Sequence, residues 1–165
     1  MGIIANGQLE KAFDKADVEI GIVLNRSPFY GEAGGQVGDT GTISGHGFEF
    51  AVQDTQRDGE LLVHIGRVNF GSLSVGAKVQ ANADVARREG IRRAHSATHI
   101  LHHALRTYLG ENATQRGSKV QQDELRFDFA HAKGLTPDEL LNIEDEINAR
   151  ISQGAPVSTK LMPIA

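Results

Sequence analysis

The sequence predicts an α+β fold: a small N-terminal antiparallel β-barrel packed on an α+β domain with a histidine-bearing helix. Two observations lead to this prediction. From Gly2 to Gly76, glycines recur between short apolar runs, a pattern typical of short strands joined by tight turns. After Ala81, apolar residues recur at helical spacing instead. The expected domains are therefore a glycine-rich barrel over residues 1–83 and an α+β domain over residues 84–165.

The expected strands are short runs of apolar residues. Phe48, Phe50 and Val52 alternate with Glu49 and Ala51, which places three large apolar side chains on one face of a strand. The same kind of alternation occurs around two phenylalanines in the second half of the chain. The predicted strands cover residues 19–24, 41–43, 48–52, 61–68 and 73–79 in the first half, and 125–129 and 157–162 in the second.

Two helices are expected in the second half, each with signals at its ends. The first covers residues 85–109, with Asp84 as N-cap and Gly110 as the left-handed residue after its last turn. The second begins with a capping box and has a proline at its first position. The residues that define this second helix are Thr136, Pro137 and Glu139 at its start and Gly154 at its end.

Composition excludes several classes of protein. Seventeen Lys and Arg against twenty-one Asp and Glu give a formal net charge of -4, so any contact with a polyanion must be local. The absence of cysteine excludes disulfides, a thiol nucleophile and thiolate metal ligands within this chain. No secretory signal pattern occurs, and no run of roughly 18 apolar residues could span a bilayer. We therefore expect a soluble, cytoplasmic protein.

Four histidines fall on one face of the first predicted helix. His95, His99, His102 and His103 lie within an arc of about 100°, since successive residues turn by about 100°. The pairs 95/99 and 99/103 have the spacing at which two imidazoles reach one metal ion. The same rings can instead be packed or solvated without a metal. A third ligand would have to be another histidine, an acid or water, because the chain has no cysteine.

Four segments together resemble the editing domain of alanyl-tRNA synthetase. They are RSPFYGEAGGQVGDTGTI, HSATHILHHALRTYLG, QRGSKV and LRFDFAH, in this order and at these separations. The resemblance extends from about Phe13 to Val157. Freestanding alanyl-tRNA editing proteins are similar as well, and the editing domain of threonyl-tRNA synthetase is similar more distantly.

The resemblance implies a zinc site that this chain holds only in part. In the family, the histidines corresponding to His95 and His99 ligate zinc, and a Cys-x-x-x-His further along supplies two more ligands. This chain ends at Ala165, ahead of the expected position of that motif, so its second domain is expected to be C-terminally incomplete. Zinc is therefore expected to bind weakly or not at all.

The resemblance also implies catalytic roles for two residues. Thr98 corresponds to the threonine that helps to distinguish serine from alanine, and Gln115 to the glutamine beside the ester that is cleaved. From the residues alone, the Thr98 hydroxyl could equally bond a backbone carbonyl within the helix. Gln115, on spacing alone, would be an ordinary loop glutamine.

The tripeptide Gly34-Gly35-Gln36 also has two interpretations. Gly-Gly-Gln is the hydrolytic tip of peptide-chain release factors, but the residues flanking it here resemble the editing family more closely. Its glycines permit close approach of the backbone, which suits a substrate-binding role and an ordinary turn alike. We expect Gly34, Gly35 and Gln36 to contact the substrate or the tRNA.

Four arginines precede the histidine motif on the same predicted helix. Arg87, Arg88, Arg92 and Arg93 give residues 84–93 a net charge of +2 once Asp84 and Glu89 are subtracted. Such a run is either a solvated helix face or a contact with phosphates of the tRNA acceptor stem. We count all four as candidate tRNA-binding residues.

The function expected from the resemblance is hydrolytic proofreading by an aminoacyl-tRNA deacylase. The substrate would be tRNA(Ala) carrying serine or glycine at its acceptor end, and the ester would be cleaved. A second hypothesis is that the chain is a catalytically impaired fragment that only binds the tRNA acceptor end or acts as a scaffold.

Overall fold

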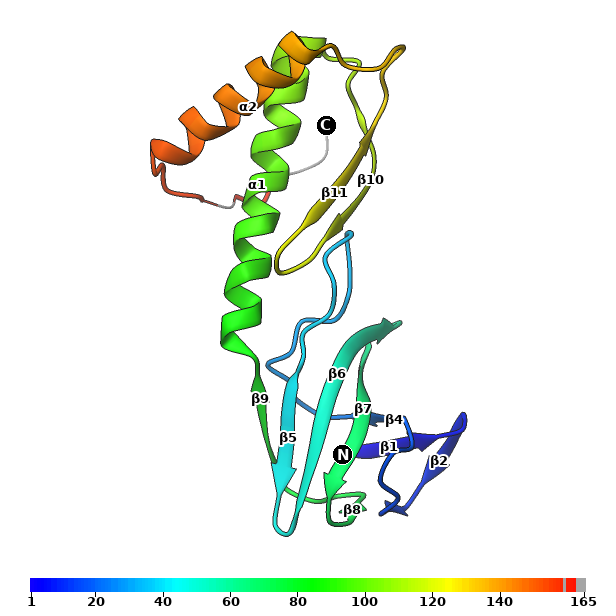
Figure 1. Cartoon of the computed structure of the whole chain (residues 1–165). Helices are drawn as coiled ribbons and strands as arrows, with labels where there is room; N and C mark the ends of the chain where they lie inside the picture. Colours follow the sequence, from blue (N-terminus) through cyan, green and yellow to red (C-terminus); the bar gives the residue numbers. More distant parts are fainter. Residues whose placement is uncertain (159, 163–165) are drawn as a thin grey trace. The chain divides into compact units, whose positions relative to one another are not determined.

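The computed structural model describes residues 1–158 and 160–162 and has a mixed α and β fold with antiparallel sheets (Figure 1). The described residues contain two helices, as the sequence predicts. Contacts group the chain into two compact units, of which unit 1 comprises Met1–His95 and Gly117–Arg126. Unit 2 comprises residues 96–116 and the described residues from 127 onward. The domain division at residues 83 and 84 stays a prediction.

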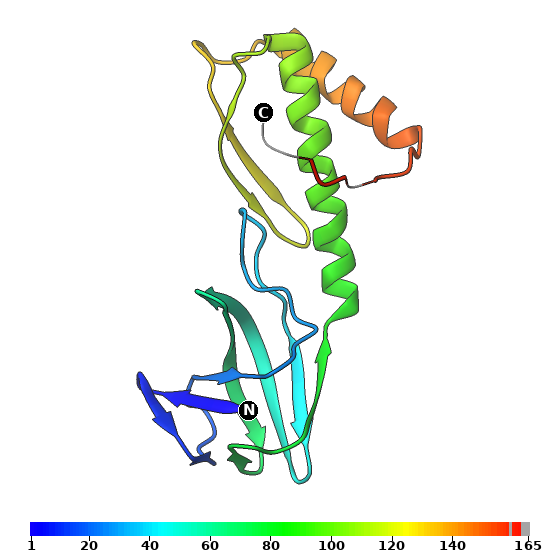
Figure 2. The same cartoon turned by 180° about the vertical axis from the view of Figure 1, so that it is seen from behind.

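Unit 1 is built on a seven-stranded antiparallel sheet with the strand order β2-β1-β4-β7-β6-β5-β9. The two longest strands, β6 and β7, run side by side in both cartoon views (Figure 1, Figure 2). The closure of this sheet into a barrel stays a prediction. The strands are β1 (Gly2–Ala5), β2 (Gln8–Glu10), β4 (Ile20–Val23), β5 (Gly41–Gly45), β6 (Phe48–Asp58), β7 (Leu61–Phe70) and β9 (Val79–Ala83).

Most of the predicted strands of the first half are confirmed, although β6 continues to Asp58, beyond the predicted end at Val52, and the strand predicted over residues 73–79 is wrong. Residues 73–79 do not form one strand, because one strand ends at Ser74, the next begins only at Val79, and Gly76 between them has a φ of +84° that interrupts the extended backbone. The first of these, β8 (Leu73–Ser74), pairs with β3 (Ala12–Phe13) in a sheet of its own. The second is β9, at one edge of the large sheet.

Strand β6 contains a bulge that changes which of its residues face the core. Val52 pairs with Gly66 and Asp54 with Ile65, so Gln53 has no partner position of its own on β7. Before the bulge the even-numbered residues of β6 are buried, and after it Thr55 is buried instead. The alternation seen in the sequence therefore applies only to the first part of this strand.

The core of unit 1 is formed by large apolar side chains of the sheet, and Phe29 completes it from the loop after β4. Ile3, Ile22, Ile43, Phe50 and Leu73 have no exposed surface at all. Burial of each such side chain contributes roughly 1.5–3 kcal/mol to folding. The remaining members of this core are Ala5, Ile20, Phe48, Val52 and Val68.

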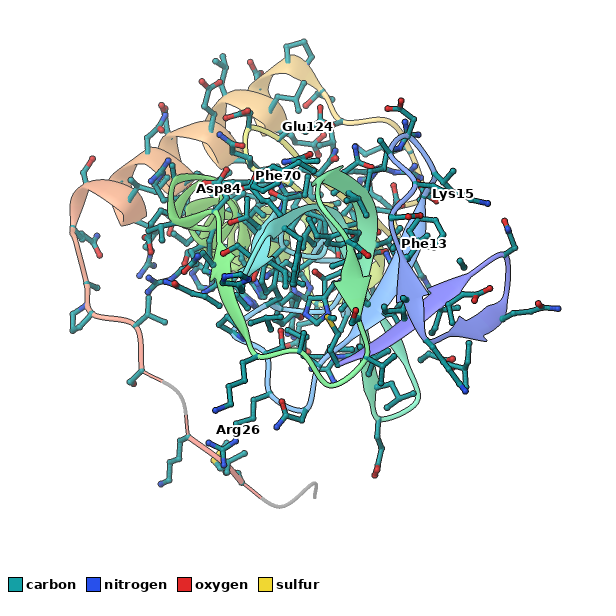
Figure 3. The ribbon with its side chains drawn as sticks, turned by 90° about the horizontal axis from the view of Figure 1, so that it is seen from below. Phe13, Lys15, Arg26, Phe70, Asp84 and Glu124 are labelled. Carbon is teal, nitrogen blue, oxygen red and sulfur yellow. The ribbon has the colours of Figure 1, made fainter. Side chains whose placement is uncertain are left out.

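Helix α1 (Val85–Leu109) confirms the first predicted helix at both ends. Asp84, which is labelled in Figure 3, accepts a hydrogen bond from the backbone N–H of Arg87 at 3.0 Å and caps the helix. Gly110 follows the last turn with a φ of +90°. The first turns of α1 belong to unit 1 and the turns from Ser96 onward to unit 2.

The second half of the chain also contains a hairpin and a second helix. Strand β10 (Gln115–Val120) pairs with β11 (Leu125–Phe129), which confirms the predicted strand at 125–129. Helix α2 (Pro137–Ser152) starts with the predicted capping box between Thr136 and Glu139. The core of unit 2 joins Leu105 of α1, Ile143 of α2 and neighbouring apolar residues.

The predicted final strand over residues 157–162 is not confirmed. Val157, Ser158 and residues 160–162 form no strand, and Thr159 lies outside the described residues. Within the described part of the chain, neither helix is long and apolar enough to cross a membrane.

Candidate functional site

The histidines of α1 are the first candidates for a site. His95 and His99 stand one turn apart on α1, and so do His99 and His103. His95 is half-buried, whereas His99 and His103 are exposed. The spacing by itself permits two imidazoles to reach one metal ion.

The described residues do not complete a zinc centre around this pair. Zinc takes four ligands, and catalytic sites usually draw three of them from protein. No group of three or more His, Cys, Asp or Glu side chains is placed to hold a metal ion among the residues that the structure describes. His95 and His99 therefore offer two donors at most, and zinc binding stays a prediction.

The Gly-Gly-Gln motif and the histidine motif meet at His95. The Nδ1–H of the His95 ring donates a hydrogen bond to the Oε1 atom of Gln36 at 2.7 Å. These residues are 59 positions apart in the sequence and both belong to unit 1. The structure thus joins two motifs that sequence analysis identified separately.

A buried carboxylate attaches the loop that carries Gln36 to α1. We call residues 28–39 the 28–39 loop. Asp39 is 1% exposed, and its Oδ2 atom accepts hydrogen bonds from the backbone N–H of Tyr30 at 2.7 Å and from the guanidinium of Arg88. Arg88 also donates to the carbonyl of Pro28 at 2.7 Å. Both ends of the loop are therefore bonded to one arginine.

The four candidate arginines differ in what they contact. Arg87 donates to the carbonyl of Gly38 at 2.8 Å, so Arg87 and Arg88 both hold the 28–39 loop. Arg92 is exposed and pairs with Glu89 at 2.7 Å, and Arg93 is exposed as well. The role of all four in tRNA binding stays a prediction.

The 28–39 loop is also paired with strand β10. The N–H of Val120 donates to the carbonyl of Gly35 at 2.8 Å, and the N–H of Val37 donates to the carbonyl of Val120 at 3.2 Å. Gly35 has a φ of +83°, and a Cβ atom at this position would overlap the backbone of Ser118. Only glycine fits here without a shift of the neighbouring strand.

Thr98 and Gln115, the two candidate catalytic residues, both lie in unit 2. Thr98 is 6% exposed on α1, whereas Gln115 is exposed at the first position of β10. Beside Gln115, the carbonyl of Thr114 accepts a hydrogen bond from the N–H of Ala130 at 3.0 Å, which fixes the backbone there. Their assigned roles stay predictions.

An open hollow of about 400 Å³ lies beside the second half of α1. At its wall, the Nε2 atom of His102 is buried and has no hydrogen-bond partner among the residues that the structure describes, and the His102 ring contacts Phe127 with centroids 5.1 Å apart. His103 faces Glu146 of α2, with 3.9 Å between Nε2 and Oε1. The hollow is lined by His99, His102, His103, Arg106, Thr107 and Glu111.

A buried serine–histidine pair in unit 1 was not predicted from the sequence. His64 on β7 has no exposed surface, and its Nε2 atom accepts a hydrogen bond from the hydroxyl of Ser27 at 2.6 Å. Its Nδ1–H donates to the carbonyl of Ile22 at 2.8 Å. The edge of the ring packs against Phe29. The only signal in the sequence was a histidine inside an apolar strand.

We expect unit 1 to lose stability as the pH falls below about 6.5, because burial lowers the pKa of His64. The bond to the Ile22 carbonyl opposes this shift but is the smaller effect. Between the lowered pKa of the folded state and the value of about 6.5 in the unfolded state, only the unfolded chain takes up the proton. The free energy of unfolding should then fall by up to about 1.4 kcal/mol per pH unit.

Urea unfolding between pH 5 and 8 measures this dependence. His64→Gln should flatten the profile, while His46→Gln, at an exposed turn, should leave it as in the parent. Identical profiles for the parent and His64→Gln would contradict the assignment.

Comparison with known families identifies the class of protein. Residues 1–87 match a family model described as tRNA synthetases class II (A). Because the match covers 87 of the 165 residues, the chain belongs to the class II tRNA synthetase family, alanyl-tRNA synthetase type. Membership gives the chain a tRNA-related role in translation, with tRNA as its partner. The match ends in the first turn of α1, so the histidine motif lies outside it.

Proposed function

We propose that this chain hydrolyses the ester of mischarged tRNA(Ala) as a proofreading deacylase. The family supplies tRNA as the partner, and the histidine motif on α1 supplies the resemblance to an editing site. The observation that carries the proposal is the hydrogen bond between His95 and Gln36, which links the histidine motif with the Gly-Gly-Gln loop. His95, the first residue of the histidine motif, and Gln36 both belong to unit 1.

The reaction is an ester hydrolysis. Water adds to the carbonyl carbon, the bond to the 3′-terminal ribose oxygen breaks, and that oxygen leaves with a proton to give free amino acid and tRNA. In this proposal the side-chain amide of Gln115 donates a hydrogen bond to the carbonyl oxygen of the ester, which becomes the oxyanion when water adds. The hydroxyl of Thr98 bonds the hydroxyl of a serine side chain.

The need for such a reaction follows from the limits of binding pockets. A pocket sized for alanine cannot fully exclude the smaller glycine, and it rejects an added hydroxyl only weakly. A second site that bonds a hydroxyl removes serine selectively, because an analogue without the hydroxyl leaves the site's polar group unpaired. Serine is therefore the acyl group that the Thr98 hydroxyl would select, and glycine is proposed as the second acyl group because the alanine pocket cannot fully exclude it.

The tRNA backbone would be held by local positive charge. Arg87 and Arg88 hold the 28–39 loop, so the exposed Arg92 and Arg93 are the better proposed phosphate contacts. Such contacts weaken as salt concentration rises, because binding releases counterions from the nucleic acid. His95 and His99 are the proposed zinc donors. The proposed hydrolysis itself uses the chain's own side chains.

A second candidate function is binding of the tRNA acceptor end without catalysis. It is favoured by the lack of a third metal ligand among the described residues. A chain of this kind would bind Ser-tRNA(Ala) and leave its ester intact. Binding measured by filter retention, together with deacylation measured on the same sample, separates the two functions.

We expect Thr98 and Gln115 to affect deacylation in different ways. Thr98→Val removes a buried hydroxyl while keeping the shape of the side chain, so the preference for serine over alanine should narrow by about 1–3 kcal/mol, or roughly 5- to 150-fold. Gln115→Ala removes a donor from the transition state and should slow turnover of every acyl group, by roughly 10²-fold. Rates are measured on Ser-, Gly- and Ala-tRNA.

Thr114→Ala, at the neighbouring exposed position, is the matched control and should retain the parent rates. Equal loss on all three substrates in Thr98→Val, or a changed preference at unchanged rate in Gln115→Ala, would reverse the two roles. A parent that binds but never cleaves would establish the binding function instead.

A further inference from the structure

We propose that Gln36 is a positioning residue that holds His95 in a single tautomer, with the hydrogen on Nδ1 and the lone pair on Nε2. This inference deepens the proposed function, on which it rests only in treating His95 as a residue of the site. It starts from the 2.7 Å contact between Gln36 Oε1 and His95 Nδ1. A carbonyl oxygen only accepts hydrogen bonds, so Nδ1 must be the protonated nitrogen.

Gln36 is held firmly enough to impose this choice. Its backbone N–H donates to the carbonyl of Ala33 at 3.0 Å, and the N–H of Ala33 donates back to the carbonyl of Gln36 at 3.2 Å. The residues on either side, Gly35 and Val37, are both bonded to Val120 of β10. The backbone of Gln36 is therefore fixed from two directions, and only its side chain has to be ordered to make the contact.

The helix end of the contact is fixed as well. Arg87 and Arg88, two turns before His95 on α1, bond to the 28–39 loop at Gly38, Asp39 and Pro28. The charge of Arg88 is matched by the buried carboxylate of Asp39. These hydrogen bonds join the 28–39 loop to α1, so the distance between Gln36 and His95 does not depend on a flexible segment.

The contact with Gln36 determines which nitrogen of the His95 ring carries the hydrogen. A neutral imidazole in water exchanges between two tautomers, and the bond made by one ring nitrogen decides which tautomer is present. An oxygen acceptor on Nδ1 is the arrangement that orients a histidine whose Nε2 is to act as a ligand or a base. Gln36 would then act on the site through His95, without touching the ester.

Nitrogen-15 NMR of the histidine rings tests this inference directly. The experiment uses the full chain at about pH 8, and His95→Gln assigns the signal by its loss. We expect the parent to show the Nδ1–H tautomer at His95. Gln36→Leu removes the acceptor and should produce a mixture of tautomers, whereas Gln36→Glu keeps an acceptor oxygen and should restore the Nδ1–H form.

A matched control and a second readout distinguish positioning from a merely structural role. Gln8→Leu, on the exposed strand β2, should leave the His95 signal unchanged. Deacylation should fall by roughly 10-fold or more in Gln36→Leu and recover in Gln36→Glu, as for other residues that orient a functional histidine.

The results that would contradict the positioning role of Gln36 differ from those that would contradict the proposed function. An Nε2–H tautomer in the parent, or a signal that does not change in Gln36→Leu, would overturn the inference. A parent with the Nδ1–H tautomer and no deacylation would instead overturn the proposed function and leave the positioning role intact.

Discussion

Replacing Asp39 by alanine is expected to destabilise the protein by about 3 kcal/mol, at the low end of the range for breaking a buried ion pair. The carboxylate is buried, and it accepts hydrogen bonds from the Tyr30 backbone and the Arg88 guanidinium. Its loss leaves a backbone N–H without its acceptor. The Arg88 side chain is 34% exposed and can recover part of its solvation in the variant. The expected loss of stability therefore stays below the upper end of the range for breaking a buried ion pair. Urea unfolding measures the change.

The matched control is an ion pair on the surface of the same helix. Arg92 and Glu89 are bonded at 2.7 Å, but their side chains are 69% and 47% exposed. Glu89→Ala should therefore cost less than about 1 kcal/mol. If Asp39→Ala costs no more than Glu89→Ala, the buried pair does not hold the 28–39 loop.

A second large effect is expected at Gly35, where alanine should cost about 3 kcal/mol and reduce deacylation. Two costs add at this position. The φ of +83° is unfavourable for any residue with a Cβ, by about 1 kcal/mol. In addition, the new methyl group would overlap the carbonyl of Ser118, which forces β10 or the loop to move. Such movement would also displace Gln36 from His95.

Gly34 supplies an internal reference for this prediction. It also has a positive φ, of +60°, but a Cβ there meets no atom within 4 Å. Gly34→Ala should therefore show only the backbone cost of about 1 kcal/mol. Unfolding midpoints of the two variants are compared directly, and equal losses of stability would contradict the assigned contact.

The helices of this protein were predictable because their signals are local. Asp84 and Gly110 mark the ends of α1, and Thr136 with Glu139 marks the start of α2, all within a few residues of the element that they define. Capping requires only a side chain and a nearby backbone N–H, so no distant contact has to be known.

The strands were predictable only in part. The hairpin of β1 and β2 was missed, although Asn6 and Gly7 occupy its two turn positions with φ of 50° and 74°. An Asn-Gly pair is a strong hairpin signal, and here it directly follows an apolar strand, so this information was present in the sequence. The bulge at Gln53 is different, since it depends on the partner strand and leaves no mark in the alternation.

Of the candidate site, only the part that lies on one helix could be predicted. The spacing of His95 and His99 follows from their positions on α1. The contact of His95 with Gln36, however, joins residues 59 positions apart. Likewise, nothing in a run of arginines tells that Arg88 pairs with the buried Asp39, because the pairing depends on where the loop returns to the helix.

If a related chain lacks one residue of β6, Gln53 is the position at which it is most easily lost. Elsewhere in a strand a deletion turns every later side chain to the opposite face of the sheet. At the bulge, Val52 and Asp54 already pair with the adjacent residues Gly66 and Ile65, so a deletion there leaves a regular ladder. Thr55 would keep its buried position, with its hydroxyl bonded to the Asp39 carbonyl. The pleat thus restricts where this strand can vary in length over evolution.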